Sequence, residues 1–259
     1  MLEQKNLFTK ENKITTAIKR IKMFVPQEGY YLAFSGGKDS VVLKKLAELA
    51  QVKFDAHYSV TTIDPPEVVK FIKQHHQDVI FDKPKNPFLA LLQTKGFPIR
   101  QGRWCCELLK ETNGKGRTVL TGIRWQESAN RAKRGLVEAC YKDKLKTYVN
   151  PLIDWDIGDV WTFIKSYKIP YCELYDQGFK RIGCLFCPMR YYKNRLEECK
   201  KYPKFVKAFV NAFEKLYQRR LSQGNSSVSR WKSGEEMFWW WVNAAPKHKE
   251  DKRQLNLFF

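Results

Sequence analysis

Residues 30–50 read YYLAFSGGKDSVVLKKLAELA, and this stretch decides the fold. The apolar and aromatic run 30–34 is typical of a buried strand, and residues 41–50 are typical of a helix. The residues between them are Ser35, Gly36, Gly37, Lys38, Asp39 and Ser40. Two glycines let the backbone turn tightly, so that successive N–H groups point at one anion, and the helix adds its positive N-terminal end. The loop therefore predicts a binding site for a pyrophosphate or a sulfate-like group.

The spacing of this loop separates it from two other phosphate-binding patterns. Lys38 adds a full positive charge, but the loop matches neither GxxxxGK[ST], the Walker A pattern, nor GxGxxG, the Rossmann dinucleotide pattern. A kinase-like P-loop and a Rossmann site are therefore both disfavoured. An ordinary glycine-rich turn between a strand and a helix is the structural alternative.

Strand-like and helix-like runs alternate through most of the chain. Apolar residues at helical spacing predict an amphipathic helix over residues 9–25, and another helix is expected over 67–75. Short apolar runs predict further strands at residues 54–60, 78–81 and 117–121. Strands that alternate with helices in this way predict an α/β fold with a parallel sheet flanked by helices.

The charge of the chain bears on its partners. The 259 residues include 47 Lys and Arg against 27 Asp and Glu, a formal net charge of +20. Such an excess attracts a polyanion, and nucleic acid is the first expectation, although a basic surface also serves solubility alone. The sequence has neither an apolar stretch long enough to span a membrane nor the pattern of a signal peptide, so we expect a cytoplasmic protein with no membrane partner.

The composition changes near residue 188. Residues 188–259 hold 16 Lys and Arg against 7 Asp and Glu, and the alternation of strands and helices ends there. Residues 205–221 place aromatic side chains on one helical face. We therefore expect an N-terminal helix over residues 1–25, a nucleotide-binding domain over 26–188, and a basic, aromatic, mostly helical extension over 189–259.

Further segments indicate a family. Residues 121–131 read TGIRWQESANR, residues 150–161 read NPLIDWDIGDVW, and residues 175–178 read YDQG. Together with the SGGKDS loop, these segments resemble the phosphoadenosine phosphosulfate (PAPS) reductase-like family of PP-loop ATP pyrophosphatases, which has the adenine nucleotide alpha hydrolase fold. The resemblance runs from about residue 30 to residue 188 with its landmarks in order. Members of this group cleave ATP between the α and β phosphates and adenylate an oxygen, or they bind a nucleotide that is already adenylylated.

The resemblance also implies roles for single residues. ATP would bind at the SGGKDS loop with Mg²⁺ shielding its phosphates, and Gly122 and Arg131 would complete the nucleotide site. Lys38 and Arg124 would stabilise the charge that builds as pyrophosphate leaves. Asp39 would orient Mg²⁺, and capping of the helix is its structural alternative. The expected catalytic residues are thus Lys38, Asp39 and Arg124.

Seven cysteines in a reducing compartment do not suggest disulfides, so their spacing has to indicate their use. Cys105 and Cys106 are adjacent, and Cys184 and Cys187 form a CxxC pair. By themselves these four thiolates suit either zinc or an iron–sulfur cluster. The arrangement resembles that of adenylyl-sulfate-type reductases and of the ATP pyrophosphatase of DNA phosphorothioation systems, which implies a [4Fe-4S] cluster that organises the site rather than transferring electrons. Zinc and no metal are the alternatives. The cysteines expected to serve packing are Cys140, Cys172 and Cys199.

One feature of sulfonucleotide reductases is missing from this sequence. Those enzymes attack the sulfur of their substrate with a cysteine in a mobile C-terminal tail, and no cysteine follows Cys199 here. Basic and aromatic residues occupy this region instead, and they suggest phosphate contacts and base stacking, with an aromatic core and a solvated basic face as the alternative. These residues are Tyr191, Tyr192, Lys193, Arg195, Lys200, Lys201, Arg219, Arg220, Arg230, Trp231, Lys232 and 239–241.

These observations predict an ATP pyrophosphatase and sulfurtransferase. It would adenylate an oxygen of a nucleic acid, with DNA as the first expectation, and a partner cysteine desulfurase would supply the sulfur. The strongest resemblance is to the iron–sulfur ATP pyrophosphatase subunit of DNA phosphorothioation systems, and a tRNA thiolase is a variant of the same reading. The alternatives are a PAPS or adenylyl-sulfate (APS) reductase that releases sulfite, and a non-catalytic nucleic-acid-binding subunit.

Overall fold

The computed structural model describes residues 12–141, 143 and 145–244. The chain divides into two compact units, each built from segments that lie far apart in the sequence. Unit 1 comprises Met1–Val60, Asp64–Lys83 and Leu109–Gly183, and unit 2 comprises Thr61–Ile63, Pro84–Leu108 and Cys184–Phe259. The expected three-part division at residues 25 and 188 stays a prediction.

A mostly parallel sheet forms the centre of unit 1. Its strands are β1 (Tyr30–Ala33), β2 (Phe54–Ser59), β3 (Ile80–Asp82), β4 (Thr118–Leu120), β5 (Val137–Ala139) and β6 (Thr147–Val149). Among the described residues their order is β3-β2-β1-β4-β6-β5, and every neighbouring pair is parallel except β5 and β6. The predicted α/β fold is confirmed, and β5 adds an antiparallel edge that the sequence analysis did not predict. Strand β1 lies where the strand order reverses, and the carboxyl end of a strand at such a switch point is where ligands bind in open α/β sheets.

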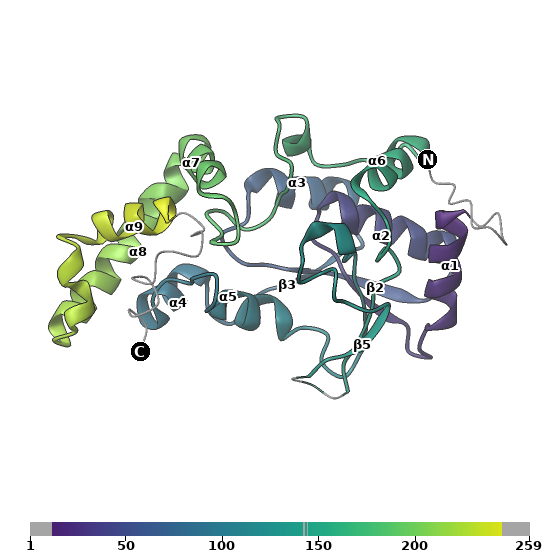
Figure 1. Cartoon of the computed structure of the whole chain (residues 1–259), viewed down its shortest axis with the longest axis horizontal. Helices are drawn as coiled ribbons and strands as arrows, with labels where there is room; N and C mark the ends of the chain where they lie inside the picture. The colour runs from purple at the N-terminus through teal and green to yellow at the C-terminus, as the bar shows by residue number, and fades with distance from the viewer. Residues whose placement is uncertain (1–11, 142, 144, 245–259) are drawn as a thin grey trace. The chain divides into compact units, whose positions relative to one another are not determined.

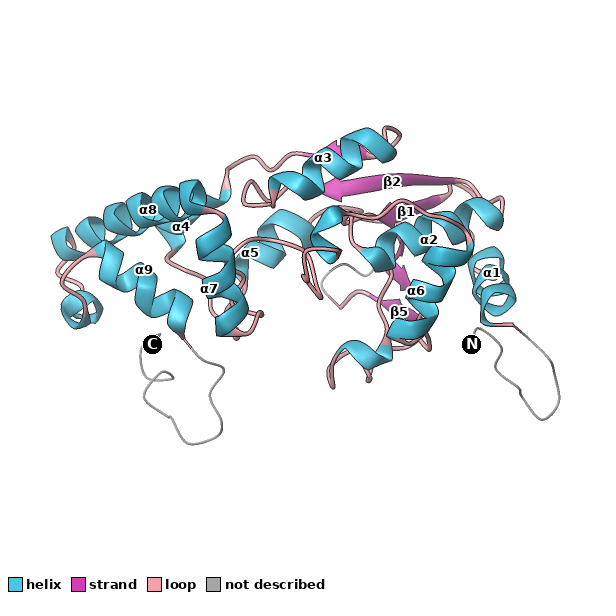
Figure 2. Ribbon diagram, turned by 90° about the horizontal axis from the view of Figure 1, so that it is seen from above, coloured by secondary structure: helices cyan, strands magenta, loops and turns pink. Residues whose placement is uncertain are grey.

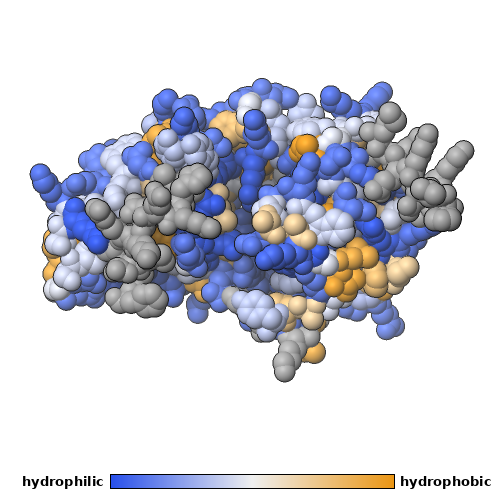
Figure 3. Space-filling model, viewed as in Figure 1, coloured by the Kyte–Doolittle hydropathy of each residue, from blue (hydrophilic) through white to orange (hydrophobic). Residues whose placement is uncertain are grey.

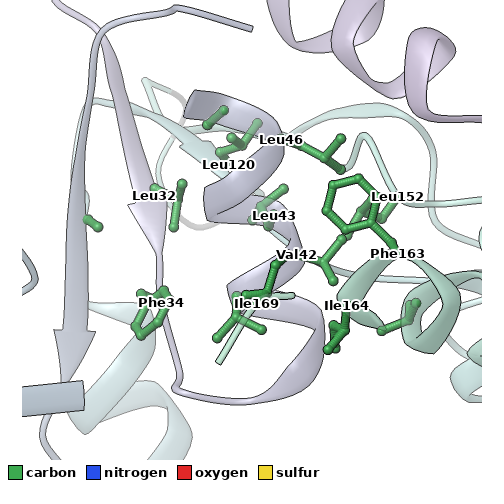
Figure 4. Close-up of a cluster of buried hydrophobic side chains, with 14 of the residues drawn as sticks. Leu32, Phe34, Val42, Leu43, Leu46, Leu120, Leu152, Phe163, Ile164 and Ile169 are labelled. Carbon is green, nitrogen blue, oxygen red and sulfur yellow. The ribbon is translucent and has the colours of Figure 1, made fainter. Parts of the chain in front are cut away.

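Four helices pack on one face of this sheet and enclose the core of unit 1 (Figure 1). They are α1 (Lys13–Met23), α2 (Lys38–Leu49), α3 (Pro66–His75) and α6 (Ile157–Ser166). In Figure 4, Leu32 of β1, Leu43 and Leu46 of α2 and Phe163 of α6 point into one cluster, and all four are fully buried. Burial of each such side chain contributes about 1.5–3 kcal/mol, so this cluster fixes α2 and the loop before it on the sheet.

Unit 2 is built mainly from helices. They are α4 (Phe88–Lys95), α5 (Trp104–Cys106), α7 (Tyr192–Lys201), α8 (Pro203–Ser222) and α9 (Gly234–Asn243). The longest, α8, packs along α4 and α9 (Figure 2), and aromatic rings such as Phe213 and Trp241 fill the space between them. A Cβ on Gly234 would lie 2.2 Å from the Cα of Glu214, so only glycine allows α9 to start this close to α8.

Shorter helical turns connect the main elements. They are a π-helical turn at Glu107–Glu111 and 3₁₀ turns at Trp125–Glu127, Glu173–Tyr175 and Ser226–Arg230. The helices expected over 9–25, 67–75 and 205–221 are found as α1, α3 and α8. Helix α8 begins before its predicted start, at Pro203, because a proline without an N–H suits the first position of a helix.

The surface is predominantly polar on the face drawn in Figure 3, where hydrophobic residues appear only in small, scattered groups. Within the part of the chain that the structure describes, no helix is both long enough and apolar enough to cross a membrane.

Candidate functional site

The SGGKDS loop leaves the carboxyl end of β1 and runs directly into α2. Gly36 has φ +70°, a left-handed conformation that favours glycine. A Cβ at this position would lie 2.9 Å from Cγ1 of Val68 and 3.0 Å from Cδ1 of Ile72, and both of these α3 side chains are buried. The loop therefore packs tightly on α3, and Gly36 is needed for its path.

The first turn of α2 offers hydrogen-bond donors at the positive end of the helix. Its N-cap is Gly37, which provides no side-chain cap. The N–H of Lys38 donates to the hydroxyl of Tyr175 at 2.9 Å, and the N–H of Gly37 approaches the hydroxyl oxygen of Ser35 at 3.4 Å. Ser40 stabilises the turn, since its hydroxyl donates to the carbonyl of Gly37 at 2.8 Å. The positive end of the helix dipole thus lies at the loop, which suits an anion, and an anion bound to these N–H groups would replace the hydroxyls of Tyr175 and Ser35.

Three charged side chains meet beside this turn. The Asp39 carboxylate accepts from Lys38 Nζ at 3.0 Å and from Arg124 Nε at 2.7 Å. Lys38 is 6% exposed and Arg124 is 3% exposed, so both cations have little access to water. Arg124 also donates to the carbonyl of Trp155 at 3.3 Å, which fixes its guanidinium. Lys38 and Arg124 together carry two positive charges and Asp39 carries one negative charge. The group therefore has a net positive charge, which a phosphate group would neutralise.

The structure distributes the other nucleotide-site candidates differently. A Cβ on Gly122 would lie 3.1 Å from the carbonyl oxygen of Asp39, so this glycine lets the segment after β4 approach the first turn of α2. Arg131 forms an ion pair with Glu127, four residues earlier, and the same carboxylate accepts from the backbone N–H of Arg124 at 3.0 Å, so among the described residues Arg131 is connected to the Asp39 group only through Glu127. Asp39 does not cap α2, because Gly37 holds the N-cap position. The proposed roles of these residues in ATP binding stay predictions.

Tyr175 is a site residue that the sequence analysis did not single out. Its hydroxyl accepts from the N–H of Lys38, and its ring lies 5.7 Å below the Lys38 ammonium. The sequence does place Tyr175 in the YDQG segment, but that segment indicated only the family resemblance and no contact with the loop. A tyrosine hydroxyl on a loop N–H and a ring under the loop lysine together position both groups that would meet a phosphate.

The four cysteines of the expected metal site all belong to unit 2. A hydrogen bond with Cys106, burial, and the nearby thiols of Cys184 and Cys187 raise the pKa of Cys105. The other three thiols therefore lie near enough to Cys105 to affect its pKa, and a metal centre held by all four stays a prediction. Among the described residues, no group of three or more His, Cys, Asp or Glu side chains is arranged so that it could hold a single metal ion.

The CxxC segment is held in an unusual conformation. Phe186 has φ +55°, which is unfavourable for a residue with a side chain. Its fully buried ring packs edge-on against Phe209, with centroids 4.9 Å apart, and its N–H donates to the Glu198 carboxylate at 2.7 Å. Burial raises the pKa of Glu198, and its ion pair with Arg190 opposes this effect. Packing, a hydrogen bond and an ion pair together impose the loop that presents Cys184 and Cys187.

The remaining cysteines were expected to serve packing. Cys172 and Cys199 are buried, which confirms that expectation for these two. Burial raises the pKa of the Cys199 thiol to about 12, with a further increase from Glu198. Cys140 is only half-buried, and its sulfur lies 4.0 Å from the Tyr148 hydroxyl. The packing interpretation is therefore weaker for Cys140 than for the other two.

The basic and aromatic residues of the C-terminal region divide into two groups. Arg195, Trp231 and Trp241 are at most 5% exposed, so the expectation that they contact phosphates or bases is wrong and the core alternative holds for them. They are buried because α7, α8 and α9 pack against one another. The exposed basic residues of the set are Lys193, Lys200, Lys201, Arg219, Arg230 and Lys232. Residues 245–259 lie outside the described residues.

Comparisons with known proteins indicate the family of this chain. The phosphoadenosine phosphosulfate reductase domain matches residues 29–190. An uncharacterized protein of Methanocaldococcus jannaschii is 30% identical over 258 residues, covering 95% of this chain and 60% of that protein. The adenosine 5'-phosphosulfate reductase of Allochromatium vinosum is 30% identical over 140 residues, covering 47% of this chain and 52% of the enzyme. The chain thus spans 60% or less of the length of these two relatives.

A solved structure supports the same fold. The phosphoadenylyl-sulfate reductase of Candida auris, in a phosphate complex, superimposes with a TM-score of 0.51 at 20% identity, covering 65% of this chain and 88% of that one. The sheet with β1 at its switch point, the SGGKDS loop and the domain match over residues 29–190 lead to one conclusion. The chain belongs to the phosphoadenosine phosphosulfate reductase domain family.

Proposed function

We propose that this protein is an ATP pyrophosphatase that activates an oxygen of a nucleic acid for replacement by sulfur. The observation that carries the proposal is the Lys38–Asp39–Arg124 group at the N-terminus of α2. It combines backbone donors, a helix dipole and two poorly solvated cations at one point. Such preorganised positive charge stabilises charge that develops in a transition state, here on the departing pyrophosphate.

The proposed reaction has two steps. The acceptor oxygen attacks the α phosphorus of ATP, the bond between this phosphorus and the oxygen that bridges to the β phosphorus breaks, and pyrophosphate leaves with Mg²⁺. Sulfur from the persulfide of a partner cysteine desulfurase then displaces AMP, which carries the acceptor oxygen away, and a thiol reductant cleaves the remaining S–S bond. Lys38 and Arg124 would bind the phosphates, and Asp39 would exchange one of its two cations for Mg²⁺.

The four-cysteine set fits a [4Fe-4S] cluster. The thiols of Cys106, Cys184 and Cys187 all act electrostatically on Cys105, and the sequence offers sulfur ligands at all four positions. Among the described residues, no group of side chains is arranged to hold a single metal ion. A [4Fe-4S] cluster does not require such a group, because each of its four thiolates binds a different iron atom. When bound, the cluster would supply a covalent cross-link between the α5 region and the CxxC loop.

The state of Cys199 makes this residue an unsuitable nucleophile for sulfite release. A reductase of this family would need a reactive, accessible thiolate as nucleophile. Cys199 is 8% exposed, and burial raises its pKa to about 12. It is therefore a poor substitute for the mobile cysteine of sulfonucleotide reductases.

The proposed acceptor rests on charge. The net charge of +20 and the exposed lysines and arginines of α7 and of the segment before α9, such as Lys200 and Lys232, support a polyanionic substrate, with DNA preferred. A cytoplasmic location and a cysteine desulfurase partner belong to the same proposal.

The test is pyrophosphate release from ATP by anaerobically purified protein, with and without duplex DNA and with RNA as a second polyanion. We expect release that increases with DNA and falls at least tenfold in the K38M variant. A K165Q variant is the matched control, because this exposed lysine of α6 lies outside the loop and outside the residues proposed to contact DNA, and it should leave release unchanged.

The alternatives give different results in the same experiment. Sulfite release from APS or PAPS with thioredoxin would replace the proposal by a sulfonucleotide reductase. Tight, salt-dependent DNA binding without any ATP cleavage would indicate a non-catalytic subunit. Stimulation by RNA and not by DNA would move the proposal to a tRNA thiolase.

A further inference from the structure

Arg195 of α7 is a buried cation whose surroundings do not satisfy it. The residue is 2% exposed. Its Nη1 donates to the carbonyl of Trp241 at 3.0 Å, and its Nη2 donates to the carbonyl of Ala244, so two of its nitrogens close the C-terminal end of α9. Its Nε is buried and has no hydrogen-bond partner among the described residues. An unpaired buried N–H is costly, which indicates that something else uses it.

The charges around Arg195 are also out of balance. Arg190 and Arg195 face one buried carboxylate, Glu198, and the ion pair of that carboxylate is with Arg190. Arg100 lies within electrostatic range and adds another positive charge. A buried cation without a counter-charge is strongly destabilising, so a missing negative group is expected nearby.

The CxxC loop contacts the same helix as Arg195, because the N–H of Phe186, between Cys184 and Cys187, donates to Glu198 of α7 at 2.7 Å. The Cys187 thiol interacts electrostatically with Arg195, and in its thiolate form it would stabilise the guanidinium. Four thiolates outweigh the positive charge of a [4Fe-4S] core, so a cluster bound by them is anionic. It would supply the counter-charge that this part of unit 2 lacks.

We infer that Arg195 is a positioning residue of the four-cysteine site, which neutralises an anionic iron–sulfur cluster and offers it a hydrogen-bond donor. The inference rests on the proposed cluster. Arg195 would then have two roles: its guanidinium would neutralise the cluster, and it also donates hydrogen bonds to the C-terminal end of α9. Hydrogen bonds and charges just outside the ligands tune such centres and typically change affinity by roughly 10–100-fold.

The test compares wild type, R195Q, R195K and R220Q after anaerobic reconstitution. Arg220 is a matched control: it is a partly buried arginine of unit 2 whose guanidinium lies over the Phe97 ring, 5.9 Å from its centroid, and none of its interactions with described residues involves a cysteine. The readouts are iron and acid-labile sulfide per chain, the Fe–S stretching frequencies in resonance Raman spectra, and the half-time of cluster loss to a chelator. Unfolding midpoints are measured in parallel.

We expect R195Q to lose its cluster roughly 10–100-fold faster than wild type and with shifted Fe–S frequencies. R195K should retain iron because it keeps the charge, and R220Q should behave like wild type. Wild-type retention and frequencies in R195Q, or equal loss in R195Q and R220Q, would overturn the inference.

If R195Q does not fold, R195K decides. This variant keeps the charge but cannot reproduce both hydrogen bonds to the end of α9. If Arg195 has a purely structural role, R195K should lower the unfolding midpoint and lose iron. If the inference holds, R195K should retain iron. Wild-type protein without iron would instead refute the proposed cluster, whereas iron in wild type with no effect of Arg195 refutes only the role of the arginine.

Discussion

Gly36 and Gly37 are adjacent, yet the structure assigns them different tasks, and alanine at each position separates folding from ATP binding. Gly36 has φ +70°, and a Cβ there would lie 2.9 Å from Val68 Cγ1 and 3.0 Å from Ile72 Cδ1. Gly37 has φ −84°, which any residue adopts, and its nearest neighbours would be Ser35 Oγ and Tyr175 Oη, both at 3.4 Å.

The magnitudes follow from these contacts. In G36A, the left-handed backbone costs about 1–2 kcal/mol and overpacking against two buried side chains costs about 1–3 kcal/mol, so the expected loss is about 2–5 kcal/mol. In G37A, ordinary contacts leave stability within about 1 kcal/mol. The new methyl group would lie beside the hydroxyls of Ser35 and Tyr175, which accept from the N–H groups of the loop, and would hinder a phosphate from replacing them. Loss of one hydrogen bond to a phosphate costs about 1.5–3 kcal/mol, which weakens ATP binding at least tenfold.

The assay pairs urea unfolding with ATP binding on the same preparations. We expect G36A to lower the unfolding free energy strongly, and G37A to raise the Kd for ATP at least tenfold with nearly unchanged unfolding. Equal stability of G36A and wild type would refute the packing argument. Unchanged ATP binding in G37A would show that the nucleotide does not use this loop.

Three further changes test other parts of the account. R124Q should slow pyrophosphate release by roughly 10²–10³-fold with little change in unfolding, and wild-type release would exclude Arg124 from the transition state. Burial acts to raise the pKa of Asp55, but the hydrogen bonds and charges of Arg117 and His57 together outweigh it and lower the pKa below 3.8. This contribution to stability is present above the unfolded pKa and is lost as pH falls through the folded one. R117M should therefore be destabilised most near pH 7 and converge with wild type in acid, and a pH-independent difference in urea midpoints would contradict this. G234A forces a Cβ to within 2.2 Å of the Glu214 backbone and should cost about 3 kcal/mol or more, so a melting temperature equal to that of wild type would contradict the packing of α8 and α9.

Local chemistry made the phosphate loop predictable. Two glycines, a lysine and a following helix determine by themselves where an anion would bind, and the structure places Gly36 in the conformation that this requires. Arg124 lies 85 residues from its partner Asp39, so periodicity and spacing could not join them, and only the resemblance suggested their relation. Tyr175 was missed for the same reason, because its contact with Lys38 spans 137 residues.

Composition could not show which faces of the C-terminal helices are buried. Arg195 and Trp241 look like nucleic-acid contacts in a basic, aromatic sequence, but tertiary packing buries both of them. The strand β5 was also missed, since it is a short edge strand that lies antiparallel to β6 and carries no apolar run. In each case the deciding contact lies between elements, where a single sequence gives little information.

The central claim is that ATP is cleaved between its α and β phosphates at the SGGKDS loop. The most direct test supplies ATP labelled at the α phosphorus, together with duplex DNA and no sulfur donor, and follows the label. The account predicts labelled AMP and transient label on the nucleic acid, both abolished in K38M. Labelled ADP as the product, or AMP formation that does not depend on Lys38, would contradict it.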